Sequence, residues 1–235
     1  MKKIISKILS FLIFVLLWIV GKIIFQIINK VKIIGKENLP KDKGKGILYL
    51  SNHQTLIDSL LVGIAVINLK EIIFKQKNIP ISAPDKKNFF ESKKSCFIMK
   101  LTNSVPVSRK PLRKEDIKKQ INLFVSVLKK NNLHIFFEGS RTRTGKINNC
   151  KYGVAKTILE ARPRHVVPIT LININQIMPI EVGFCYKKIK RGKEGYLIIG
   201  ENIDFSDIYN QEILEIQKIE QIKTRIREKI SENFF

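Results

Sequence analysis

Segments with strand and helix character alternate along most of this chain, and this alternation restricts the fold more than any other feature of the sequence. Short apolar runs are separated by stretches whose apolar residues recur at helical spacing. We expect strands at 46–51, 71–75, 105–108, 133–137, 165–172, 179–186 and 196–200. We expect helices at 55–69, 92–101, 113–130 and 151–162, and a C-terminal helix with one stripe of Ile216, Ile219, Ile222, Ile226 and Ile230. The pattern predicts an α/β fold with a mostly parallel central sheet flanked by helices.

The first thirty residues differ from the rest of the chain because they are almost entirely apolar. The run 8–20 follows three lysines, and Lys22 separates it from a second apolar run at 23–28. A spanning helix needs about 20 uninterrupted apolar residues, and Lys22 interrupts this stretch. A signal peptide would be followed by a cleavage site of small residues, and none follows here. We therefore expect 1–30 to be a membrane-associating helix or helical hairpin in one leaflet, with a single-span anchor as the alternative.

The chain carries a large positive charge, since 43 Lys and Arg face 20 Asp and Glu, for a formal net charge of +23. Such a surface attracts nucleic acid, anionic lipid headgroups, phosphorylated substrates or an acidic carrier. Nucleic-acid binding favours clustered basic residues with exposed aromatic side chains. Here the lysines are spread along the chain, and the aromatic residues lie mainly in apolar segments. We expect an anionic membrane surface as a partner, and no nucleic acid.

Neither cysteine nor histidine shows the spacing of a metal site. Cys96, Cys150 and Cys185 are odd in number and widely separated, so they indicate no disulfide framework. The three histidines have no metal-ligand spacing with them. We expect a reducing compartment and no bound metal.

The loop after the predicted strand 46–51 contains a histidine and an aspartate with the spacing H-x4-D. If His53 and Asp58 shared one helix, they would lie about 140° apart around its axis and could not meet. They can meet if His53 precedes the helix and Asp58 lies one turn inside it, with Thr55 as the N-cap. A carboxylate on one imidazole nitrogen leaves the other nitrogen as a general base. The alternative interpretation has no catalytic role: a histidine in a loop, followed by an aspartate that only caps the first turn of the helix, has the same spacing.

A second loop, after the predicted strand 133–137, is rich in glycine and basic residues. It reads EGSRTRTGK from Glu138 to Lys146. Glycine lets the backbone approach a ligand, and arginine is a preferred ligand of phosphate. A nucleotide-binding P-loop is excluded, because five residues separate its glycines and Ile147 replaces the Ser or Thr that would bind Mg²⁺.

Two further segments carry weaker signals. Arg109 ends the predicted strand 105–108 and is a candidate phosphate ligand or a solvated charge. Pro168 lies within the predicted strand 165–172, where proline indicates an edge strand or a place where the ladder opens.

These four segments, in this order, resemble the four blocks of the glycerolipid acyltransferase family, which includes 1-acyl-sn-glycerol-3-phosphate acyltransferases. The matching segments are 52–58 (NHQTLID), 105–109 (VPVSR), 137–141 (FEGSR) and 167–170 (VPIT). Phe137 and Ser140 stand where the family usually has Pro and Thr, and Asn103 stands where the second block usually begins with Gly. Glu138, Gly139 and Arg141 remain in place, so we expect the turn of the third block to be kept. Asn tolerates a positive φ angle better than most residues.

The resemblance implies an enzyme that transfers an acyl chain to a lysolipid hydroxyl. By this resemblance, residues 31–235 form an acyltransferase domain in which His53, oriented by Asp58, is the base. The acceptor phosphate would be held by a second group of residues, and Pro168 would border the acyl donor. The implied phosphate-binding residues are Arg109, Glu138, Gly139, Ser140 and Arg141.

The expected acceptor is lysophosphatidic acid, and the product would be phosphatidic acid. Glycerol 3-phosphate, another lysophospholipid or a lyso-ornithine lipid are alternative acceptors. No cofactor is expected, because the acyl donor is a co-substrate: coenzyme A thioester, acyl carrier protein thioester or acyl phosphate. We expect the enzyme at the cytoplasmic face of the cell membrane.

Overall fold

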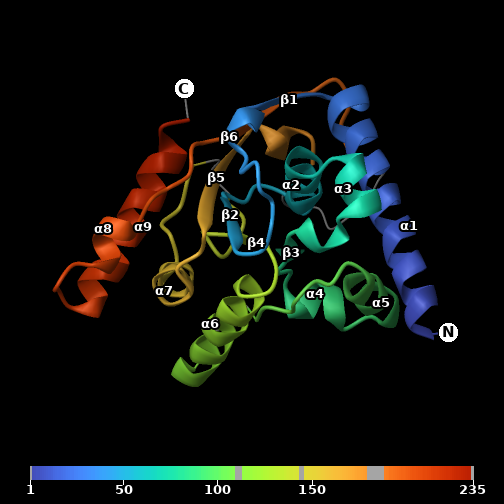
Figure 1. The fold of residues 1–235 in the computed structure, drawn as a ribbon. Helices are drawn as coiled ribbons and strands as arrows, with labels where there is room; N and C mark the ends of the chain where they lie inside the picture. The colour runs from blue at the N-terminus through green and yellow to red at the C-terminus, as the bar shows by residue number, and fades with distance from the viewer. Residues whose placement is uncertain (1, 109–112, 143–145, 179–187, 234–235) are drawn as a thin grey trace.

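The computed structural model describes residues 2–108, 113–142, 146–178 and 188–233, and in these a six-stranded sheet lies between two layers of helices (Figure 1). The strands are β1 (Lys30–Ile34), β2 (Ile47–Ser51), β3 (Ile81–Ser82), β4 (Leu133–Phe136), β5 (His165–Ile172) and β6 (Glu194–Ile199). Their order is β1-β6-β5-β2-β4-β3, and only the β5–β6 pair is antiparallel. The predicted α/β fold with a mostly parallel sheet is confirmed.

The helices of the described residues lie on both faces of this sheet. They are α1 (Lys2–Lys22), α2 (Asp58–Val66), α3 (Leu69–Phe74), α4 (Lys86–Phe90), α5 (Lys93–Leu101), α6 (Lys114–Leu128), α7 (Tyr152–Ala161), α8 (Ser206–Tyr209) and α9 (Glu215–Ser231). Single turns of 3-10 helix add Lys36–Asn38, Gln76–Asn78 and Ile174–Gln176. In Figure 1 the helices α7 and α9 lie to one side of the sheet, and α1, α2 and α3 lie to the other.

The central strand β2 is buried on both faces, which makes it the centre of the core. Leu48 and Leu50 pack into the apolar cluster that contains α6, α7 and α9. Ile47 and Tyr49 alternate with them and pack into the cluster that contains α2. This alternation follows from the two-residue period of a strand, and the helices on both faces make it apolar throughout. The loop that leaves β2 therefore starts from a rigid position.

The C-terminal stripe of isoleucines is largely as predicted. Ile219, Ile222, Ile226 and Ile230 are buried along α9, at the spacing of one helix face. Ile216 was expected in the same stripe, but it lies in the first turn and is 54% exposed.

The predicted strand 71–75 is wrong, because these residues belong mainly to the helix α3. Asn68 caps this helix: its side chain accepts a hydrogen bond from the Glu71 backbone N–H at 2.9 Å. The Glu71 carboxylate in turn accepts one from the Asn68 N–H at 2.9 Å. This capping box satisfies two N–H groups that a short helix would otherwise leave without partners. The apolar run alone did not distinguish a strand from a helix.

The predicted strand 105–108 is also wrong. Val107 forms only an isolated bridge with Asp85, and Val105 donates its N–H to the Ser82 carbonyl at 3.0 Å. The segment thus follows the end of β3 without extending the sheet. The predicted strand 179–186 lies outside the described residues.

Pro168 lies in a central strand, so the edge-strand interpretation is wrong. The second interpretation, an opening of the ladder, is correct on the β6 side. The β5–β6 ladder begins at the Ile169–Ile199 pair, next to Pro168, and beyond it Gly200 donates its N–H to the Pro168 carbonyl at 2.9 Å. The backbone nitrogen and the carbonyl of a strand residue point to the same neighbouring strand. Proline has no N–H, so Pro168 leaves its missing hydrogen bond on the β6 side, where the regular β5–β6 pairing ends.

The apolar front end is one continuous helix in the described residues, so of the two expected forms, a helix or a helical hairpin, the structure shows the helix. The helix α1 continues into a π-helical segment, Ile23–Ile28, and residues 4–28 are long and apolar enough to cross a membrane. Along its length α1 contacts α2, α3 and α5. Ser10 donates to the Leu101 carbonyl at 2.6 Å, and the Trp18 ring N–H donates to the Ile67 carbonyl at 3.3 Å.

Replacing Gly35 with Ala should destabilise the fold far more than replacing Gly192 with Ala. Both glycines have a positive φ, 79° and 66°, so each Ala variant carries the backbone strain of about 1–2 kcal/mol. At Gly35 the new Cβ would also collide with the Ile199 carbonyl oxygen, whereas at Gly192 it meets nothing within 4 Å. We expect Gly35→Ala to lower the free energy of unfolding, measured by urea denaturation, by about 1–3 kcal/mol more than Gly192→Ala. Equal losses would contradict the close packing of this turn on β6.

Candidate active site

The loop after β2 is tied to the end of β5 by side-chain amides. The Asn52 side chain accepts a hydrogen bond from the Leu171 N–H at 2.7 Å and donates one to the Leu171 carbonyl at 2.9 Å. Gln54 donates to the same carbonyl at 3.0 Å and accepts from the Ile174 N–H at 2.8 Å. These amides continue the pairing of β2 with β5 after the strand has ended, so they fix the position of the residue between them, His53.

His53 and Asp58 meet as the spacing predicted. His53 Nδ1 lies 2.9 Å from Asp58 Oδ2, and both side chains are buried. The same carboxylate oxygen accepts the backbone N–H groups of Gln54 and Thr55 at 2.5 and 2.7 Å. Since Nδ1 must donate to a carboxylate, Nε2 is the ring nitrogen that can accept a proton.

Thr55 does not cap α2 as expected. The helix begins at Asp58, with Ile57 at the N-cap position and no side-chain cap. The Thr55 hydroxyl instead donates to Asp58 Oδ1 at 2.5 Å and accepts from the Ile57 N–H at 3.2 Å. Both oxygens of Asp58 are therefore bonded within the turn that leads into the helix, where the positive end of the dipole also favours a carboxylate.

The second predicted loop holds the backbone of His53 from both sides. Glu138 Oε1 accepts the His53 N–H at 3.0 Å, and the Thr142 N–H donates to the His53 carbonyl at 2.8 Å. Glu138 Oε2 accepts the backbone and side-chain N–H groups of Asn148, at 3.2 and 2.5 Å. Burial raises the pKa of Glu138, and these hydrogen bonds oppose the rise. The carboxylate thus braces the loop that carries His53.

An aromatic layer lies against the imidazole of His53. The Phe136 ring, at the end of β4, stacks on it with centroids 3.7 Å apart and planes inclined by 9°. His134 meets the edge of Phe136 at 4.7 Å, and its Nε2 lies 2.9 Å from the Ser51 hydroxyl. Burial lowers the pKa of His134 to about 3, so this second imidazole is neutral at physiological pH.

The remaining predicted residues have different positions. Gly139 and Ser140 are exposed and Arg141 is partly exposed, directly after the buried Glu138, so they form a rim beside His53. Gly139 has a φ of 70°, and a Cβ there would come within 3.0 Å of the Lys151 side chain. Arg109 lies outside the described residues.

Pro168 does not line this site. It pairs with Leu50 in register, three residues before His53, and its side chain is buried. A Cβ at Gly200 would come within 3.0 Å of the Pro168 ring, so the proline packs over the end of β6.

An apolar cleft of about 300 Å³ lies between β4, α6 and α7. Phe136 and Gly139 belong to its wall, together with Ile121 and Phe124 of α6 and Val154 of α7. Since Phe136 also stacks on His53, an apolar chain in this cleft would lie close to the imidazole.

No group of three or more His, Cys, Asp or Glu residues in the described part of the chain could hold a metal ion.

The acyltransferase family model matches residues 30–172, which is more than half of the chain. The chain belongs to the acyltransferase family. The match includes all four sequence blocks, and it begins after α1.

A comparison with solved structures finds the 1-acyl-sn-glycerophosphate (LPA) acyltransferase PlsC from Thermotoga maritima. The two chains share 16% sequence identity and a TM-score of 0.61, over 94% of this chain and 80% of that chain. At this identity the likeness concerns the fold. A comparison with curated proteins gives no match.

Several residues of the acyltransferase site were not singled out from the sequence. Gln54 positions His53 through a β5 carbonyl, Phe136 through a ring stack and Thr142 through a backbone hydrogen bond. His134 contacts the edge of Phe136. A polar residue beside a motif, such as Gln54, is a signal that could have been used. The others act across strands that are distant in sequence.

Replacing Glu138 with Gln should loosen the His53 loop. The two carboxylate oxygens accept three N–H groups, whereas an amide has a single acceptor oxygen and would turn its NH2 toward a donor. We expect the free energy of unfolding to fall by about 1–3 kcal/mol. Urea denaturation checks this against Glu194→Gln, a change at an exposed side chain. Equal stability of the two variants would show that Glu138 does not brace the loop.

Acid should destabilise the acyltransferase partly through His134. The folded state does not protonate this residue until the pH approaches about 3, whereas the unfolded chain does so below about 6.5, so stability falls as the pH drops through that window. Between pH 7 and pH 5 the wild type should lose about 2 kcal/mol more than His134→Gln, by urea denaturation at both values. Parallel losses would mean that His134 titrates normally in the folded protein.

Proposed function

We propose that this acyltransferase transfers a fatty acyl chain from an acyl thioester to the free hydroxyl of 1-acyl-sn-glycerol 3-phosphate, giving phosphatidic acid in phospholipid biosynthesis. The observation that carries the proposal is the buried Asp58 carboxylate on Nδ1 of His53, beside an apolar cleft. The likeness of the fold to an LPA acyltransferase supports the acceptor.

In the proposed mechanism, His53 Nε2 removes the proton of the acceptor hydroxyl while its oxygen attacks the thioester carbonyl. The tetrahedral intermediate then expels the thiolate, which takes the proton back from the imidazolium. Asp58 stabilises the imidazolium and needs no proton of its own. The base contributes about 10²–10⁴-fold, and no covalent acyl-enzyme forms.

The acceptor phosphate would bind at the rim formed by Gly139, Ser140 and Arg141, with Arg109 as a further ligand. Gly139 allows close approach of the backbone, and guanidinium groups bind phosphate in two-point contacts. Glu138 contributes by holding this rim against the His53 backbone. Binding the phosphate there orients the hydroxyl toward Nε2, which supplies much of the remaining acceleration.

An acyl chain would occupy the cleft between α6 and α7. The cleft is mostly apolar and begins at the ring that stacks on His53, so a chain in it has its carbonyl end near the base. Gly153 of α7 belongs to its lining, and a Cβ there meets nothing within 4 Å. A larger side chain at Gly153 would therefore occupy part of the space in the cleft.

Gly153→Leu should shift the acyltransferase toward shorter acyl chains. The leucine would occupy part of the cleft, so we expect kcat/KM for long-chain substrates to fall by about tenfold relative to short-chain substrates, as for a few lost methylene contacts. Assays with substrates of graded chain length measure this. Gly63→Leu is the control, because Gly63 is a helix glycine with equal room on α2. If Gly153→Leu leaves the preference for chain length unchanged, this cleft is not the binding site of the acyl chain.

The front end, residues 1–30, would lie in one leaflet with its exposed face in the acyl chains. The exposed apolar residues of this stretch are Ile4, Ile5, Ile8, Leu9, Leu12, Leu16, Ile19, Ile23 and Ile27. The opposite face packs on α2, α3 and α5, so the helix and residues 31–235 approach the membrane together. A lysolipid could then reach His53 without leaving the surface.

The acyl donor would come from the cytoplasm, as a thioester of coenzyme A or of acyl carrier protein, or as an acyl phosphate. All three are anionic, and the net charge of +23 attracts them as well as anionic lipids. No resident cofactor is needed for this chemistry.

The decisive test is acyl transfer by the purified enzyme in detergent, beside His53→Ala. Lysophosphatidic acid and glycerol 3-phosphate serve as acceptors with each of the three donors. We expect phosphatidic acid from the lysolipid, lost by at least about 10²-fold in the variant. If only glycerol 3-phosphate gives a product, it replaces lysophosphatidic acid as the acceptor. Turnover that is unchanged in His53→Ala would exclude His53 as the base.

A further inference from the structure

The imidazole of His53 lies flat on the aromatic ring of Phe136. Their centroids are 3.7 Å apart and their planes are inclined by only 9°, so the imidazole faces the π surface of the ring and not its edge. The face of an aromatic ring carries the negative part of its quadrupole. A cation that lies over such a face, within about 6 Å of the centroid, is attracted to it. An imidazolium at the position of His53 therefore meets the condition for a cation–π contact.

The ends of two parallel strands hold this stack in place. Phe136 is the last residue of β4, and it pairs in register with Ser51, the last residue of β2. His53 follows Ser51 by two residues, and its backbone is held by Glu138 and Thr142. The contact between the two rings is therefore built into the fold before a substrate binds.

The surroundings of the stack favour a contact of this kind. A cation–π contact gains strength where water is excluded, and His53 is only 4% exposed. The titratable groups that face the stack, in the described part of the chain, are Asp58, Glu138 and His134. Asp58 accepts from Nδ1, and Glu138 accepts the backbone N–H of His53. Because burial lowers the pKa of His134 to about 3, this residue brings no positive charge to the Phe136 ring at neutral pH.

We propose that the π face of Phe136 stabilises the imidazolium form of His53, and that it makes His53 a stronger base than Asp58 alone would. In the proposed reaction the hydroxyl proton of the acceptor moves to Nε2, so positive charge appears on the ring that faces Phe136. The neutral imidazole has no such charge, and the attraction therefore favours the protonated form. The inference rests on the proposed role of His53 as the base, and Phe136 acts through His53 as a positioning residue.

A purely steric role for Phe136 makes a different prediction. An apolar side chain of similar size could fix the plane of the imidazole without stabilising its charge. Ring fluorines separate the two roles, because they withdraw electron density from the π face and leave the shape of the ring almost unchanged. A steric contact is kept in a fluorinated ring, whereas an electrostatic attraction weakens with each fluorine.

The test replaces Phe136, in the full chain in detergent, with phenylalanines that carry one, two or three ring fluorines. The NMR signal of the His53 Cε1–H is followed against pH, and its absence in His53→Ala identifies it. We expect proton binding by His53 to weaken with each fluorine, by about tenfold for three. The kcat/KM of acyl transfer should fall in the same order, since a weaker base removes the proton more slowly. An identical His53 titration throughout the series would overturn the proposal.

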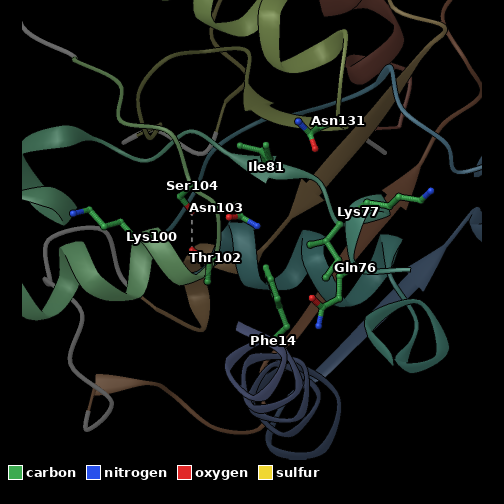
Figure 2. A pocket seen from close by; sticks show the side chains of 10 residues that line it. Phe14, Gln76, Lys77, Ile81, Lys100, Thr102, Asn103, Ser104 and Asn131 are labelled. Atoms are coloured by element: carbon green, nitrogen blue, oxygen red, sulfur yellow. Dashed lines mark hydrogen bonds between the residues drawn. The ribbon is translucent and has the colours of Figure 1, made fainter. Parts of the chain in front are cut away.

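Two other phenylalanines are matched controls for the fluorinated series. Phe137 is the next residue along the chain, but it is buried in the cluster that contains α6, α7 and α9. Phe14 of α1 points into a cavity of about 520 Å³ whose wall includes Ile81, the first residue of β3, and Asn131, which precedes β4 (Figure 2). His53 instead follows the end of β2, so Phe14 lies toward the opposite end of the strands.

We expect three fluorines at Phe137 or at Phe14 to leave proton binding by His53 unchanged. A loss at either control as large as the loss at Phe136 would overturn the proposal, because the effect would then not depend on the stacked ring.

Standard substitutions give a second, independent measurement. Phe136→Leu keeps an apolar side chain but removes the π face, whereas Phe136→Tyr keeps the face. We expect Phe136→Leu to weaken proton binding by His53 about tenfold, and Phe136→Tyr to stay within about twofold of the wild type. Equal losses in the two variants would show that packing alone matters, and would overturn the proposal.

The His53 titration needs no substrate, so its result is independent of the proposed function. If the wild type transfers acyl chains but His53 titrates identically in every Phe136 variant, only the role of Phe136 is overturned. If the titration is graded as expected but the enzyme transfers no acyl chain, the stabilisation of the imidazolium is supported and the proposed function alone fails.

Discussion

The whole site depends on one desolvated carboxylate, that of Asp58. It accepts the imidazole Nδ1–H of His53, two backbone N–H groups and one hydroxyl, all within the six residues from His53 to Asp58. A buried charge is tolerated only where such partners replace water, so the turn can hold a carboxylate there only in this conformation. The conformation that satisfies Asp58 is the one that orients the base.

The sheet supplies the second constraint, because it brings together loops that are distant in sequence. β2 and β4 are parallel neighbours, so the residues that follow them emerge at one edge, where Glu138 and Thr142 hold the His53 backbone. Asn52 and Gln54 attach the same loop to β5 on the other side. The imidazole is therefore positioned by three strands rather than by its own loop alone.

The sequence predicted the layers of the fold and the meeting of His53 with Asp58, since both follow from local spacing. It did not predict α3, because a short apolar run fits a strand or a helix, although the Asn68 and Glu71 capping signal was present. The inward direction of Glu138 could not be predicted, because its partners, the His53 and Asn148 N–H groups, are revealed only by tertiary structure. The position of Pro168 in a central strand likewise depends on where β6 ends its pairing.

The tautomer of His53 tests the central claim most directly. Nitrogen-15 NMR distinguishes a protonated Nδ1 from a protonated Nε2, and comparison with His53→Ala assigns the signal among the three histidines. We predict that neutral His53 carries its proton on Nδ1, and that Asp58→Asn increases the Nε2-protonated form. A wild-type imidazole protonated on Nε2 would contradict the account, because Nε2 could not then act as the base.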